Sequence, residues 1–328
     1  MPWHVVPSRE KRNRPIMRIV FMGTPEFAVP SLRSLVSAGH DVALVLTRPD
    51  AVRSRGKKLE PSPVKAAALE LGLSVVETNR ISPELADELA AVHADIFCVA
   101  AYGCILPDVV FHMAPLGIVN VHASLLPRWR GAAPIQRSIL AGDETTGVSI
   151  MRIGHGVDTG AYCAQASCSV AGKSAVQLTD ELSELGAKLL VDTLPVLRRG
   201  EETWVEQDEA FVTHAAKISK AEMRLDPSAS VEEIVRHVLA SSDTAPARCS
   251  VCGKGVRIMS ARTVSGDETT VPSLEAGEVR YVGKRLFLGA FDGVFEVTEV
   301  KPDGKREMPA KAWAAGLHGG SLRWEKLV

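Results

Sequence analysis

An amide and an imidazole side chain stand two residues apart in the stretch 117–136, which reads GIVNVHASLLPRWRGAAPIQ. The apolar run at its start predicts a short strand, in which Asn120 and His122 point to the same face. An amide can donate a hydrogen bond to a developing oxyanion, and an imidazole can hold charge or move a proton. The pair therefore suits attack on a carbonyl carbon, although a hydrogen-bonded polar pair at a sheet edge would use the same residues.

A carboxylate follows later in the chain, within Gly-Val-Asp-Thr-Gly at 156–160. The two glycines predict a tight turn that presents Asp158, since glycine adopts backbone conformations that other residues avoid. Aspartate is also a favoured turn residue that accepts hydrogen bonds from nearby backbone, so the spacing alone leaves a purely structural role open.

Apolar runs and amphipathic helical patterns alternate through the first two thirds of the chain. Strand–helix–strand units of this length predict a parallel sheet covered by helices. Thr24 followed by Pro25 predicts the start of a helix over 25–38, and a long amphipathic helix is expected over 174–197. Ligands usually bind at the carboxyl ends of such strands, where the loop after His122 begins. The runs that predict buried strands are 17–22, 42–46, 95–100 and 148–153.

The loop after the first strand reads GTPEFA and lacks the G-x-G-x-x-G fingerprint, which removes the main argument for a dinucleotide enzyme. The chain has 328 residues, of which 46% are hydrophobic and 23% charged, as expected for a globular protein of two domains. Its formal net charge is −1, so a polyanionic partner would have to be met by a local basic patch.

The six cysteines are scattered through apolar stretches, which favours reduced thiols in the cytoplasm. Cys249-x-x-Cys252 lacks a second pair or nearby histidines, so we expect no metal site. No run reaches the ~18 apolar residues of a membrane span. Residues 1–16 carry five charged groups and have no apolar core for a signal peptide, and we expect them to form a disordered N-terminal extension.

The segment 47–63, TRPDAVRSRGKKLEPSP, predicts a long loop without regular structure. Its basic residues either form a solvated surface or contact phosphate groups.

The string NVHASLLPRWRGAAPIQ, followed by GVDTG, resembles the signature of the 10-formyltetrahydrofolate-dependent formyltransferases. The resemblance runs from about residue 17 to about residue 219, and more loosely to the C-terminus. It implies transfer of a formyl group from 10-formyltetrahydrofolate, without a metal, to the α-amino group of methionine on initiator tRNA during translation initiation. The implied localisation is cytoplasmic, and we expect a monomer.

The resemblance also implies roles for individual residues. Asn120, His122 and Asp158 match the catalytic positions of the family. The segment 47–63, called the basic loop below, matches an insertion of the family that reaches the acceptor end of the tRNA. The implied tRNA-binding residues are Arg55, Lys57 and Lys58, and the implied folate-binding residues are Ser124, Leu125, Leu126 and Pro127.

Short strands with Gly, Asp and Thr breaks follow residue 220 and predict a small β-barrel. We therefore expect an α/β protein, with a Rossmann-like parallel-sheet N-terminal formyltransferase domain and a smaller C-terminal OB-like β-barrel domain. The expected boundaries are 17–202 for the catalytic domain, 203–219 for a linker and 220–328 for a tRNA-binding domain.

Three alternatives remain open from the sequence. A sister enzyme would use the same donor with a small acceptor, such as a nucleotide-sugar amine or a glycinamide ribotide. A hydrolase would release formate with water in place of the amine. A non-catalytic tRNA-binding protein would keep the fold and use Asn120, His122 and Asp158 for structure only.

Overall fold

The computed structural model describes residues 16–52, 59–264, 271–317 and 322–327. By internal packing the chain forms two compact units, which are described separately below. The first unit is built from the chain up to residue 131 together with 146–168 and 179–214, and the second from 132–145, 169–178 and 215 onward. The predicted extension 1–16 lies, apart from the exposed Ile16, outside the described residues.

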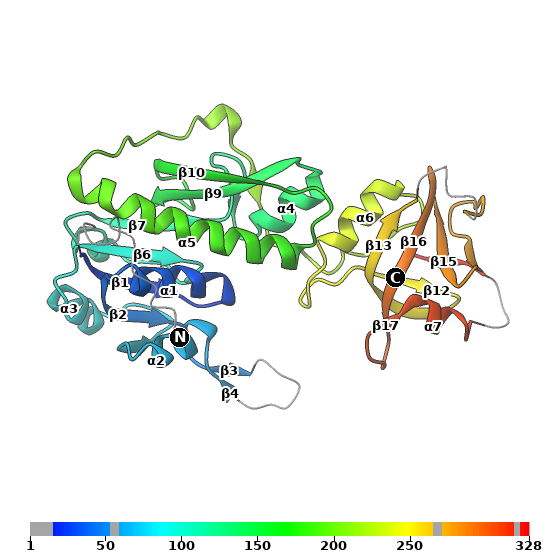
Figure 1. The fold of residues 1–328 in the computed structure, drawn as a ribbon, viewed down its shortest axis with the longest axis horizontal. Helices are drawn as coiled ribbons and strands as arrows, with labels where there is room; N and C mark the ends of the chain where they lie inside the picture. Colours follow the sequence, from blue (N-terminus) through cyan, green and yellow to red (C-terminus); the bar gives the residue numbers. More distant parts are fainter. Residues whose placement is uncertain (1–15, 53–58, 265–270, 318–321, 328) are drawn as a thin grey trace, which may run out of the picture. The chain divides into compact units, whose positions relative to one another are not determined.

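A seven-stranded mixed sheet forms the centre of the first unit (Figure 1). The five strands from β5 to β7 pair in parallel, as the sequence predicts, whereas β9 runs antiparallel to β7. In spatial order the strands are β10 (Tyr162–Ser169), β9 (Thr145–Arg152), β7 (Ile118–His122), β6 (Ile96–Ala100), β1 (Arg18–Gly23), β2 (Asp41–Thr47) and β5 (Val75–Glu77).

Both predicted helices form, but the start predicted at Thr24 is wrong. The Thr24 hydroxyl donates to the Tyr102 carbonyl at 2.9 Å instead of capping a helix, and a 3-10 turn precedes α1. The long helix α5 ends as predicted in a basic turn followed by Gly200, whose φ is +64°. The helical elements are η2 (Glu26–Ala28), α1 (Val29–Ser37), α2 (Pro63–Glu70), α3 (Pro83–Ala91), η3 (Asp108–His112), α5 (Ala175–Arg199) and η4 (Glu209–Phe211).

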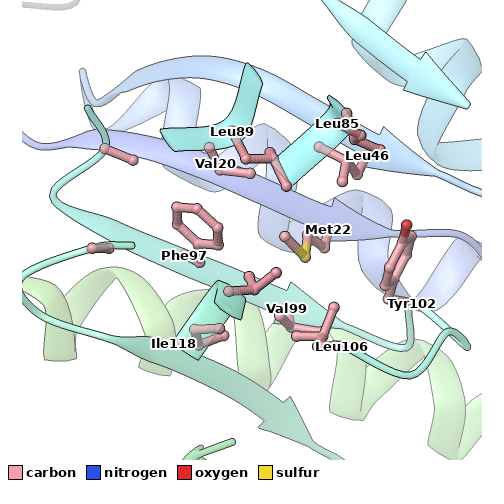
Figure 2. Packing of buried hydrophobic residues seen from close by; sticks show 13 residues of the cluster. Val20, Met22, Leu46, Leu85, Leu89, Phe97, Val99, Tyr102, Leu106 and Ile118 are labelled. Carbon is pink, nitrogen blue, oxygen red and sulfur yellow. The ribbon is translucent and has the colours of Figure 1, made fainter. Parts of the chain in front are cut away.

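One face of the sheet is covered by α3 and η3 (Figure 2). Side chains of β1, β2, β6 and β7 meet those of the two helical elements in a single apolar cluster. Burial of this many side chains is the main stabilising contribution available to the unit. Tyr102 lies in the same cluster, 2% exposed, in agreement with a packing role. The other labelled members are Val20, Met22, Leu46, Leu85, Leu89, Phe97, Val99, Leu106 and Ile118.

The opposite face of β7 is covered by α5. A Cβ atom added at Gly186 of this helix would lie 2.6 Å from Cγ1 of Val121. Glycine inside a helix is ordinarily unfavourable, so the close approach of helix and strand explains why glycine is used here. Val121 stands between Asn120 and His122, and the contact therefore fixes the strand that carries both candidate catalytic side chains.

The second unit contains a nearly closed antiparallel barrel, which confirms the predicted OB-like β-barrel domain. The Val279 amide donates to Leu322 at 2.8 Å and brings the two ends of the sheet together. Trp324 is fully buried, and its indole donates to the Gly289 carbonyl at 2.8 Å. The barrel strands are β12 (Arg248–Val251), β13 (Lys254–Thr263), β14 (Val279–Val282), β15 (Arg285–Ala290), β16 (Gly293–Pro302), β17 (Met308–Pro309) and β18 (Trp324–Glu325).

The remaining elements are short. None of the helices among the described residues is long and apolar enough to cross a membrane. The helices of the second unit and the isolated short strands are α4 (Pro134–Ala141), α6 (Val231–Leu239), α7 (Ala310–Ala314), β3 (Ala51–Val52), β4 (Leu59–Glu60), β8 (Arg130–Gly131) and β11 (His214–Ala215).

The contact between α5 and β7 gives a test of the packing. Gly186→Ala is expected to destabilise the protein by about 1–3 kcal/mol, because the new methyl group presses on Val121. Helix propensity alone predicts the opposite, a gain of about 1 kcal/mol. Urea unfolding decides between them, with Lys188→Ala at an exposed position of the same helix as the control. An increase in stability for Gly186→Ala would show that the contact is not tight.

Candidate active site

Strand β7 carries Asn120 and His122 on the same face, as the sequence predicts. Asn120 is half-buried, between Val99 of β6 and Met151 of β9. Within the described part of the chain, the side-chain amide of Asn120 makes no hydrogen bond. It is therefore available as a donor to a bound oxygen.

His122 is 6% exposed and has a protein group beside each ring nitrogen. Nε2 lies 3.0 Å from the carbonyl oxygen of Trp129, and Nδ1 lies 3.6 Å from Oδ2 of Asp158. Because a carbonyl only accepts, Nε2 carries a hydrogen in this arrangement. Nδ1, at the edge of the ring that faces Asp158, is therefore the nitrogen at which a proton can be exchanged.

The turn after β9 brings Asp158 to this position. Its backbone is left-handed, with φ at +52°, and its carboxylate oxygen Oδ2 accepts a hydrogen bond of 2.9 Å from the Gly131 amide. A Cβ atom added at Gly160 would lie 2.0 Å from the carbonyl oxygen of Arg152, so only glycine fits there. The three residues predicted as catalytic thus meet in one place, although they come from two segments.

The predicted folate-binding residues form the loop that follows β7. Ser124 and Leu126 are buried and hold the loop together: the Ser124 hydroxyl donates to the Arg128 carbonyl at 2.6 Å, and the Leu126 amide donates to Ser149 at 3.1 Å. Leu125 and Pro127 are half-buried. Of the four residues, these two present side chains that a ligand can reach.

A segment that sequence reasoning did not associate with the site crosses the same loop. The Trp129 and Arg130 amides donate to Thr213, to its hydroxyl and its carbonyl respectively, both at 2.9 Å. Arg130 is only 5% exposed, and its Nε donates to Oε1 of Gln207 at 2.8 Å. We call residues 207–213 the strap. No periodicity or motif marks these contacts, because they join residues about 80 positions apart.

The basic loop is described only at its base. Ala51 and Val52 pair with Leu59 and Glu60 in a two-residue antiparallel ladder, so the prediction of a loop without regular structure is wrong there. Next to this ladder in sequence, Asp50 accepts a hydrogen bond from Lys65 at 2.8 Å. Lys65 also donates to Glu77 at 2.8 Å, and the two hydrogen bonds raise the pKa of Lys65. The predicted tRNA-binding residues Arg55, Lys57 and Lys58 lie outside the described residues.

None of the six cysteines forms a disulfide. Burial raises the pKa of Cys163 to about 11 and that of Cys249 to about 12, so neither is a reactive thiolate. Among the described residues, no group of His, Cys, Asp and Glu side chains is arranged to hold a metal ion.

Two family models match this chain. Residues 17–194 match the family model described as formyl transferase, and residues 217–318 match the model of the formyl transferase C-terminal domain. This chain belongs to the formyl transferase family.

Relatives within the family are similar over nearly the whole chain. A protein of Methylococcus capsulatus named methionyl-tRNA formyltransferase is 44% identical over 297 residues, covering 90% of this chain and 95% of that protein. A protein of Methylobacillus flagellatus with the same name is 41% identical over 303 residues, covering 92% and 96%.

Solved structures share the fold at lower identity. HypX from Aquifex aeolicus, solved with tetrahydrofolic acid, is 18% identical with a TM-score of 0.63, covering 92% of this chain and 47% of that one. The N-formyltransferase from Helicobacter canadensis, solved with folinic acid and dTDP-3-aminofucose, is 16% identical with a TM-score of 0.61, covering 86% and 99%. At these identities the likeness concerns the fold alone.

The close approach of Gly160 to the Arg152 carbonyl predicts the effect of adding a methyl group at this position. Gly160→Ala should move the Asp158 turn, weaken the hydrogen bond from the Gly131 amide, and speed hydrogen exchange of that amide about tenfold. Gly154→Ala is the matched control, since a Cβ atom there would meet nothing within 4 Å. Equal exchange of the Gly131 amide in the two variants would contradict the account of the turn.

Proposed function

We propose that this chain is a methionyl-tRNA formyltransferase, which transfers the formyl group of 10-formyltetrahydrofolate to the α-amino group of methionine on initiator tRNA for translation initiation. The observation that carries the proposal is the identity of 41–44% to relatives of that name over about nine tenths of the chain. The convergence of Asn120, His122 and Asp158 supplies side chains suited to the chemistry.

The acceptor is a nucleophile without further activation. An α-amino group has a pKa near 7.7–8.0, so a usable fraction is neutral near pH 7 and can attack the formyl carbon. The donor supplies that carbon on a nitrogen that leaves. A new carbon–nitrogen bond forms to the amine, the bond to the folate nitrogen breaks, and the proton lost by the amine ends on the leaving nitrogen.

Asn120 and the His122–Asp158 pair divide this work. The free amide of Asn120 donates to the formyl oxygen as that oxygen gains negative charge, a contribution typically worth on the order of 10²–10³ in rate. Asp158 holds His122 and takes part in moving the proton from the amine to the leaving nitrogen. Since Nε2 is held by the Trp129 carbonyl, proton exchange falls to the Asp158 side of the ring.

The donor is proposed to lie along the loop after β7. Ser124 and Leu126 fix the loop from within, and Leu125 and Pro127 contact the folate. All four residues therefore serve folate binding, two through the shape of the loop and two by contact.

The remainder of the chain is assigned to the tRNA. We propose a catalytic domain over 17–202, a linker over 203–219 and a tRNA-binding domain over 220–328, with 1–16 as an extension. Arg55, Lys57 and Lys58 would contact phosphates of the tRNA. We further propose that the protein acts as a cytoplasmic monomer.

The decisive assay is formyl transfer from 10-formyltetrahydrofolate to methionylated initiator tRNA, with uncharged tRNA and water alone as controls. The proposal requires a formylated product with charged initiator tRNA only. Donor turnover without a tRNA product would indicate a hydrolase, and transfer to an added sugar amine or glycinamide ribotide would indicate a small acceptor. Binding of tRNA without any turnover would indicate a non-catalytic protein.

His122→Ala separates chemistry from binding. Transfer is expected to fall by about 10²–10⁴-fold, because the proton carrier is lost, while filter binding of methionylated initiator tRNA stays within about twofold of wild type. Unchanged transfer by this variant would remove His122 from the mechanism.

The role of the basic loop is tested through salt. Arg55→Ala is expected to raise KM for the tRNA several-fold and to reduce the slope of log affinity against log salt by about one, with KM for the folate donor unchanged. Arg33→Ala removes an exposed arginine paired with Glu70 and serves as the control. A KM for the tRNA that equals wild type at every salt concentration would exclude the phosphate contact.

A further inference from the structure

Gln207 is a buried side chain that uses both ends of its amide. It is 8% exposed. Oε1 accepts from Nε of Arg130 at 2.8 Å, and Nε2 donates to two backbone carbonyls, those of Asp158 at 2.8 Å and Gly160 at 2.7 Å. One residue of the strap thereby joins the loop after β7 to the turn that carries Asp158.

The orientation of this amide is fixed by chemistry. The two ends of a glutamine amide look alike in shape, so their assignment must come from the hydrogen-bond partners. A guanidinium only donates, and the Asp158 and Gly160 carbonyls only accept. The oxygen must therefore face Arg130 and the NH₂ group must face the turn, because the reverse would leave Nε of Arg130 and both carbonyls without these hydrogen bonds.

Arg130 keeps the side-chain amide of Gln207 in this orientation. Its guanidinium is 5% exposed, and apart from Gln207 it has an ion pair of 2.9 Å with the exposed Glu209. A buried cation without hydrogen-bond partners is strongly unfavourable. Arg130 thus holds Oε1 of Gln207, and the amide in turn holds the Asp158 turn.

The turn needs this support because of the direction of β9. β9 is antiparallel to β7, so its end at Arg152 pairs with Val119, at the beginning of β7. The chain must then return along the face of β7 to bring Asp158 to His122. Asp158 itself has a left-handed backbone in this return segment. Its carbonyl and that of Gly160 both accept hydrogen bonds from Gln207.

We propose that Gln207 is the positioning residue of the active site: it fixes the backbone at 158–160 so that the Asp158 carboxylate reaches both the Gly131 amide and His122. This inference rests on the proposed formyl transfer. Gln207 touches neither the formyl donor nor the amine, and it acts only through Asp158.

Two substitutions separate the bonds that Gln207 makes. Gln207→Met has a similar shape and loses all three hydrogen bonds, whereas Gln207→Glu keeps an acceptor for Arg130 but cannot donate to the turn. Both are expected to lower kcat about 10- to 100-fold, with KM for methionylated tRNA and for the donor within about twofold of wild type.

Gln177→Met is the matched control. Its amide oxygen accepts from the backbone and hydroxyl of Ser174 at the start of α5 and bonds to none of the residues predicted as catalytic. Gln177→Met therefore shows the effect of losing a glutamine that serves only the structure. We expect a small change in thermal stability and a kcat equal to that of wild type.

A double-mutant cycle with Asp158→Asn distinguishes positioning from general destabilisation. If Gln207 acts through Asp158, then Gln207→Met changes kcat by less than about twofold once the carboxylate has been removed. If the kcat losses of Gln207→Met and Asp158→Asn multiply in the double variant, the inference is wrong. It is also wrong if Gln207→Glu is fully active, because the loss in Gln207→Met would then come only from leaving Arg130 without an acceptor.

The inference and the proposed function fail in different ways. If the wild-type protein transfers no formyl group to charged initiator tRNA, the proposed function is wrong and the inference falls with it. If the wild type transfers normally and Gln207→Met does so too, only the inference is wrong.

Discussion

One carboxylate oxygen, Oδ2 of Asp158, is shared by a backbone amide and an imidazole, and much of the first unit is arranged to keep it there. The Gly131 amide donates to it at 2.9 Å, and Nδ1 of His122 lies 3.6 Å away. A carboxylate that is 19% exposed has given up much of its water, so it is stable only where such partners replace it. The strand, the loop after it and the turn after β9 are thereby held to one geometry.

Two kinds of contact maintain this geometry: the packing of α5 on one face of β7, and hydrogen bonds to the loop and the turn on the other side. Gly186 lets α5 approach Val121 closely, which fixes β7 from one side. On the other side, Thr213 and Gln207 bind the loop and the turn through backbone groups. Catalysis that depends on preorganised groups needs such support, because small displacements lower the rate strongly.

Much of the fold follows from the sequence, since buried strands and amphipathic helices have local patterns. Pro134 opens α4, and the uninterrupted apolar run over 96–100 is a fully buried strand. Asn120, His122 and Asp158 are recognisable because their residue types and spacing belong to a long family string. These features depend on residues that are close together in the chain.

Other features depend on distant partners and left no local signal. The burial of Arg130 is decided by Gln207, 77 residues later, and the hydroxyl of Thr24 is taken by Tyr102. The direction of β9 is not encoded in its apolar pattern, which is the same for parallel and antiparallel buried strands. β12 and β18 are not predicted, because runs of four and two residues are too short for an alternating pattern to stand out.

We propose that His122 and Asp158 work as one unit in formyl transfer. The deciding measurement is single-turnover transfer to methionylated initiator tRNA by His122→Ala, Asp158→Asn and the double variant. The double variant should be about as slow as His122→Ala alone, since groups that act together are lost together. If the two losses multiply, the residues act independently, and the carboxylate does not serve the imidazole.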